Sequence, residues 1–139
     1  MNAFDTVPLI QQKFAQFGGE ATIPFLREGN FTAQADEQGV WVNNLSTSPF
    51  LPWSVFEEAV SLLISKGGRA TRGDAMACHL GDAGLPFDSL EGHIAHKVYG
   101  KQIGDIVFRR ITPIACILIW AGICSAEPGE LVMIKKTEK

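Results

Sequence analysis

The chain has 139 residues, of which 46% are apolar and 19% charged, a composition that predicts one compact domain and excludes a largely disordered chain. Its formal net charge of −3 argues against a protein that binds nucleic acid through overall positive charge. The first residues lack the basic cluster of a signal peptide, and the longest apolar run, 111–123, is too short to span a bilayer. We therefore expect a cytoplasmic protein without a membrane segment.

The N-terminal part predicts an amphipathic helix followed by a β-hairpin. Apolar residues recur between Val7 and Phe17 at the three- and four-residue spacing of one helical face, and Gly18-Gly19 ends the pattern. A β-hairpin is expected with strands at 31–36 and 40–45. The stretch 21–26 before it contains a proline and is expected to be an edge strand.

Three capping boxes predict three helices in the rest of the chain. In each box, a residue whose side chain can cap a helix is followed, three positions later, by an acidic residue. The boxes are Ser54 with Glu57, Thr71 with Asp74, and Asp88 with Glu91. Glycines that suit a helix C-terminus follow at Gly67, Gly81 and Gly100.

A fourth helix is predicted from 114 to 121, with Thr112 as its N-cap and Pro113 in its first turn. Because apolar residues occupy every side of this helix, we expect it to be buried all round. A second hairpin is predicted next, with strands at 123–126 and 131–134, and a short strand is an option at 106–108.

From residue 52 onward the predicted elements are helices followed by a closing β-hairpin. This order of elements resembles the winged helix-turn-helix superfamily. The segments that carry the resemblance are Gly-Gly-Arg-Ala-Thr at 67–71, Trp-Ala-Gly-Ile at 120–123 and the turn at 127–129. It covers about residues 52–136 and implies an α+β fold, with a mainly helical winged-helix-like domain at 52–139. Residues 1–51 would form an extension, a helix and a β-hairpin, packed on that domain.

The resemblance implies a non-catalytic module that binds nucleic acid, with DNA as partner, or has a regulatory role. The local distribution of charge agrees with nucleic-acid binding by 66–110, which hold seven basic and five acidic residues, a net charge of +2. Residues 1–65 hold two basic and seven acidic residues, a net charge of −5. The apolar helix at 114–121 has no polar face with which to read bases, so the helix at 88–98 is the better reading element. The predicted contact residues are Arg69, Arg72, His93, His96, Lys97, Lys101, Arg109 and Arg110.

The alternative is a protein–protein interaction domain without nucleic-acid binding. It would form a homodimer through the N-terminal hairpin and the apolar loop Phe50–Trp53. An enzyme is the less favoured interpretation, because no set of residues with catalytic spacing is found. His93 and His96 lie on one helix face with Cys78 and His79 elsewhere, but the pattern of a metal site is incomplete. We therefore predict no catalytic residue, metal or cofactor, and we expect the cysteines to be reduced.

Overall fold

The computed structural model describes residues 2–46 and 49–134. A 3₁₀ turn at Ala3–Asp5 leads into α1 (Thr6–Ala15), and the chain continues through β1 (Glu20–Pro24), β2 (Asn30–Ala35), β3 (Gly39–Val42), β4 (Phe50–Pro52), α2 (Trp53–Ser65), β5 (Arg69–Thr71), α3 (Leu90–Tyr99), α4 (Ile111–Trp120), β6 (Cys124–Glu127) and β7 (Glu130–Met133). Every helix of this part of the chain is too short or too polar to cross a membrane.

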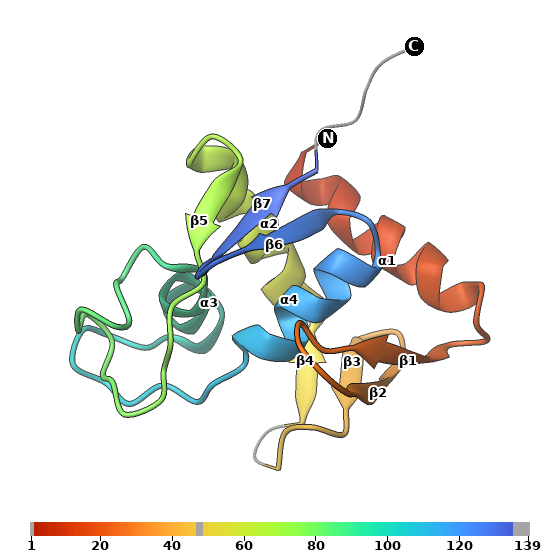
Figure 1. Cartoon of the computed structure of the whole chain (residues 1–139), viewed down its shortest axis with the longest axis horizontal. Coiled ribbons are helices and arrows are strands. Elements are labelled where there is room, and N and C mark those ends of the chain that lie inside the picture. The colour runs from red at the N-terminus through yellow and green to blue at the C-terminus, as the bar shows by residue number, and fades with distance from the viewer. Residues whose placement is uncertain (1, 47–48, 135–139) are drawn as a thin grey trace.

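The strands form two antiparallel sheets with α4 between them (Figure 1). One sheet has the order β1-β2-β3-β4, in which each strand pairs with the next along the chain. The other has the order β5-β7-β6, so the last strand is central and β5 pairs with it from far away in the sequence. The fold is therefore α+β, and the expectation of a mainly helical domain is wrong, because two sheets enclose the central helix.

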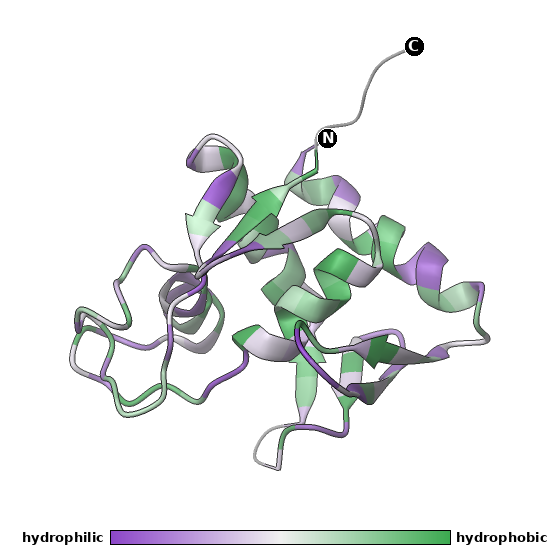
Figure 2. Cartoon of the chain, in the orientation of Figure 1, coloured by the Kyte–Doolittle hydropathy of each residue, from purple (hydrophilic) through white to green (hydrophobic). Residues whose placement is uncertain are grey.

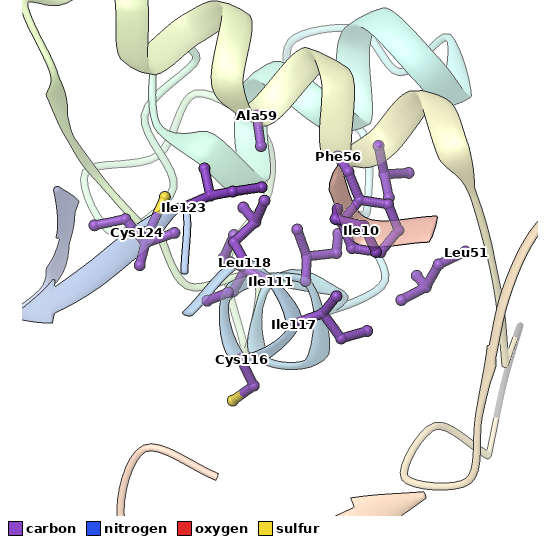
Figure 3. Close-up of a cluster of buried hydrophobic side chains, with 14 of the residues drawn as sticks. Ile10, Leu51, Phe56, Ala59, Ile111, Cys116, Ile117, Leu118, Ile123 and Cys124 are labelled. Carbon is purple, nitrogen blue, oxygen red and sulfur yellow. The ribbon is translucent and has the colours of Figure 1, made fainter. Parts of the chain in front are cut away.

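One continuous apolar core surrounds α4, as its composition predicts. The core runs from Ile10 in α1 to Leu131 in β7, and it includes residues of both 1–51 and 52–139. Figure 2 shows α4 as a strongly hydrophobic segment, and Figure 3 shows Ile117 and Leu118 of α4 in the same cluster as Phe56 of α2. Burial of such side chains supplies most of the driving force for folding.

Both predicted hairpins and the N-terminal helix are confirmed, and β1 is the edge strand expected before the first hairpin. Part of the expected apolar loop Phe50–Trp53 is instead a strand, β4, because Leu51 is buried opposite Val40 in the sheet. Gly39 permits this pairing, since a Cβ atom there would clash with the backbone carbonyl of Leu51. Phe50 stacks on Trp41 with 4.8 Å between ring centroids.

The helix predicted from the Thr71–Asp74 box is wrong. Thr71 ends β5, and the following residues form turns up to the start of α3. The backbone explains this, because Gly73 and Ala77 have positive φ angles of 79° and 60°, whereas a right-handed helix needs about −63°. The short strand considered at 106–108 is also not formed, and Ile106 makes only an isolated bridge to His79.

The turns of 72–89 and 100–110 form a lobe against α3. A second, smaller apolar cluster holds it together, composed of Ala75, Leu80, Leu85, Ala95 and Val107. Gly92 in α3 has no side chain to obstruct the carbonyl of Pro86, which lies against the helix. This close approach fixes the lobe where it borders the start of α4.

Replacing Leu118 by alanine should lower the free energy of unfolding by about 2–5 kcal/mol, since its fully buried side chain fills space between α4 and its neighbours. Urea denaturation followed by circular dichroism measures the loss. The matched control is Ile106→Ala, because the Ile106 side chain is 66% exposed and should change stability by less than about 0.5 kcal/mol. Equal losses in the two variants would contradict the central position of α4.

Candidate functional site

A groove of about 440 Å³ lies where β5, the β6–β7 turn and the start of α4 meet. We call it the arginine groove, because Arg72 and Arg109 line it on different segments. Leu26 of the β1–β2 turn and Gly129 of the β6–β7 turn complete its walls. Figure 1 shows how the β1–β2 turn lies beside the start of α4. Asp74 also lines the groove, so its charged lining is two arginines and one carboxylate.

Hydrogen bonds of its own backbone hold Arg72 in place. Its amide donates to the carbonyl of Gly129 at 2.9 Å, and its carbonyl accepts from the amide of Glu91 at 2.9 Å. The side chain is half-buried, and its Nη1 atom is buried with no hydrogen-bond partner among the described residues. A buried guanidinium N–H without an acceptor is costly, so a side-chain movement that brings Nη1 to an oxygen ligand in the groove would be stabilising.

Cys116 marks the side of α4 that faces this region. Figure 3 shows its thiol directed away from the core cluster, toward the segment between β1 and β2. Burial raises the pKa of the Cys116 thiol, while the backbone of Leu26 and the positive charge of Arg72 offset part of that shift. The thiol is therefore protonated at neutral pH and is not a nucleophile.

A second groove, of about 540 Å³, adjoins the first, because Arg109 and Thr112 line both. We call it the Phe108 groove. Its remaining lining residues are Asn44, Leu45, Ser46, Met76 and Phe108. Asn44 Oδ1 is buried and makes no hydrogen bond within the described part of the chain. The combined surface thus offers cationic groups at one end and an aromatic ring with an amide at the other.

Glu91 positions the start of α4, and this role differs from the one its spacing predicts. Ser89, not Asp88, is the N-cap of α3, and its side chain accepts from the amide of Gly92. The Glu91 carboxylate instead accepts from the amides of Arg110 at 3.0 Å and Ile111 at 3.1 Å. The predicted N-cap Thr112 is wrong as well, since α4 begins at Ile111 and Arg110 is its N-cap.

The Glu91 side chain is 1% exposed, and this burial raises its pKa to about 7. The two backbone hydrogen bonds and the charges of Arg110 and Arg109 act in the opposite direction. Carboxylates at a helix N-terminus are stabilised by the helix dipole, yet removal from water dominates here.

Arg110 is buried, with 6% of its surface exposed. Its guanidinium carbon lies 3.7 Å from the ring centroid of Tyr99, an arrangement that stabilises a cation on an aromatic face. Burial also raises the pKa of the Tyr99 hydroxyl. In this position Arg110 supports α3 and α4 and is not exposed for contact with a phosphate.

Several other predicted contact residues are held by partners. Arg69 pairs with Glu130 at 2.8 Å, and His93 Nε2 lies 2.9 Å from a carboxylate oxygen of Glu58. His96 Nδ1 lies 2.8 Å from the carbonyl of Lys101, whereas Lys97 is exposed. Of the eight residues predicted from the sequence, Arg72 and Arg109 are the two that line the arginine groove.

Sequence reasoning did not select Asn44, Thr112 or Phe108 as site residues. Phe108 was considered only as the end of the apolar run 106–108, which is typical of a short strand and gives no signal for a site. Asn44 carried none, since it is far from the basic segment in sequence. No three His, Cys, Asp or Glu side chains gather as metal ligands within residues 2–46 and 49–134.

The chain matches no protein-family model, no curated protein and no solved structure. The arguments for its function therefore rest on the grooves themselves.

The raised pKa of Glu91 predicts a stability that falls as pH rises from about 4.5 to about 7. In that window the folded protein keeps a proton on Glu91 that the unfolded chain has released, so each unit of pH favours unfolding. The loss is on the order of 3 kcal/mol and ends above pH 7. Glu91→Gln keeps an oxygen acceptor for the α4 amides but cannot titrate.

Urea denaturation of both proteins across this pH range measures the effect, and the difference between their unfolding free energies isolates Glu91 from other titrating groups. The unfolding free energy of Glu91→Gln should increase relative to that of the wild type as pH rises. Parallel curves would contradict the assigned pKa. Glu91→Ala serves as the structural control, since it leaves both amides unpaired and should be less stable than the wild type by about 1–3 kcal/mol near pH 4.5. That deficit should shrink as pH rises, because alanine, like glutamine, does not titrate.

Proposed function

We propose that the chain is a non-catalytic nucleic-acid-binding module whose arginine groove receives backbone phosphate. One observation carries the proposal: Arg72 and Arg109 line the same groove, and Nη1 of Arg72 is buried without an acceptor among the described residues. Guanidinium groups suit phosphate oxygens because their planar donors make strong charge-assisted hydrogen bonds. The hydroxyl groups of Thr71 and Thr112, which also line the groove, add donors of the kind that contact phosphates.

The order of elements supports a module of winged-helix type. Strand β5 follows α2 at 69–71, and the β6–β7 hairpin follows α4, at the two junctions where the resemblance expects a strand and a wing. The β6–β7 turn, with Gly129, borders the arginine groove, so a wing and a phosphate site would share one surface. The proposal places the main contact here, because the α3 histidines are engaged with Glu58 and with the carbonyl of Lys101.

Asp74 limits how a phosphate could lie in the groove. One of its oxygens accepts from the amide of Met76 at 2.9 Å, and its negative charge repels an anion. The favoured position is therefore toward Arg109 and Thr112, where the two grooves join. The modest net charge of the lining suits weak binding, with a salt dependence set by the one or two phosphates that the arginines neutralise.

A second candidate is contact with another protein, and exposed apolar side chains favour it. Five large ones occur in the lobe and near it: Met76, Phe87, Ile103, Ile106 and Phe108. The stacked pair of Trp41 and Phe50 offers another apolar surface at the hairpin that was predicted to mediate a homodimer. Sedimentation at high salt separates the candidates, since apolar association persists there whereas phosphate binding weakens.

Arg109→Gln should weaken binding to a random-sequence DNA by about 3- to 10-fold near 50 mM salt, because one phosphate contact is lost. The slope of log affinity against log salt should decrease by about 1. Fluorescence anisotropy titrations at several salt concentrations measure both quantities. Arg109 is exposed, so the substitution should leave the fold intact.

The matched control is Lys13→Gln, which removes a positive charge from α1, away from both grooves (Figure 1). It should leave the slope unchanged. Failure of the wild-type protein to bind near 50 mM salt, or an identical loss in both variants, would refute a phosphate site in the arginine groove.

A further inference from the structure

The two grooves are neighbours that differ in their charged and aromatic residues. Arg109 and Thr112 line both, so a ligand that crosses these two residues contacts both grooves. At one end Arg72 presents a buried donor that lacks an acceptor among the described residues. At the other end the lining is mainly apolar, with Asn44 as its amide.

Phe108 is a large aromatic residue that the fold leaves accessible. It is 48% exposed, and it lines the groove together with Met76, which is 64% exposed. The guanidinium carbon of Arg110 lies 5.6 Å from the Phe108 ring centroid, which gives the ring a cationic neighbour. An exposed aromatic ring beside positive charge is the arrangement on which nucleobases stack.

Asn44 adds a polar group at the same end. The residue lines the groove, and its Oδ1 atom is buried and without a hydrogen bond in the described residues. A side-chain amide has both an acceptor and donors. It can therefore pair with the edge of a planar heterocycle that also carries donors and acceptors, as a nucleobase does.

We infer that the two grooves together bind an unpaired nucleotide of single-stranded nucleic acid, with the phosphate against Arg72 and Arg109 and the base on Phe108, where Asn44 meets its edge. This inference rests on the proposed function and names its substrate class. A duplex offers phosphates equally well, but its base faces are covered by their neighbours and cannot stack on a protein ring. The Phe108 groove therefore has a use only for a base that is not stacked within a helix.

The test compares a fluorescently labelled single strand of about 12 nucleotides with the duplex of the same sequence, by anisotropy at about 50–200 mM salt. The wild-type protein should bind the single strand at least about tenfold more tightly. Phe108→Ala should lower single-strand affinity by about 5- to 100-fold, the effect of losing one base stack, and should leave duplex affinity unchanged. Phe108→Trp should retain the preference.

Phe4→Ala is the matched control, because Phe4 is 78% exposed and lies in the N-terminal 3₁₀ turn; it should change neither affinity. Equal binding of both nucleic acids, or unchanged single-strand affinity in Phe108→Ala, overturns the inference. The proposed phosphate site survives that outcome if Arg109→Gln still weakens binding. Absence of binding to either nucleic acid near 50 mM salt overturns the inference and the proposed function together.

Discussion

A short series of hydrogen bonds that passes through Glu91 fixes the geometry on which both grooves depend. The carbonyl of Gly129 accepts from Arg72, the carbonyl of Arg72 accepts from the Glu91 amide, and the Glu91 carboxylate accepts from the first amides of α4. The series joins the β6–β7 turn, the residue that follows β5, α3 and α4 in that order. Two of the links join backbone groups, and the third uses the carboxylate of Glu91, which is 1% exposed. The positions of Arg72 and of the residues that open α4 therefore follow from buried or backbone groups rather than from mobile surface side chains.

Patterns that depend on local sequence were sufficient for much of the architecture. The apolar character of 114–121 on every side predicts a buried helix, and α4 is one, because the two sheets cover it. Both hairpins are predicted from strand-like segments on either side of the turn residues at 37–39 and 127–129, which is also a local pattern. The Thr71–Asp74 box predicts a helix that does not form, since a capping pattern cannot show that Gly73 will adopt a positive φ angle.

The site was less predictable because it depends on contacts between distant segments. Glu91 has the spacing of a local capping residue, yet its carboxylate serves a different helix that starts twenty residues later. The charge excess of 66–110 drew attention to Arg72 and Arg109, which line one groove, but the sequence could not show that Arg69 would pair with Glu130, 61 residues away. The place of Asn44 beside Arg109 depends on how the four-stranded sheet packs, which no spacing encodes.

The central position of α4 has a consequence for how the molecule comes apart. Since α4 contacts β1 of one sheet and β6 of the other, and the core continues through all three layers, separating either sheet would bring the same apolar helix into water. Residues 1–51 and 52–139 therefore share a single cooperative unit, and neither piece retains a complete shell for its hydrophobic residues when the other is cut away.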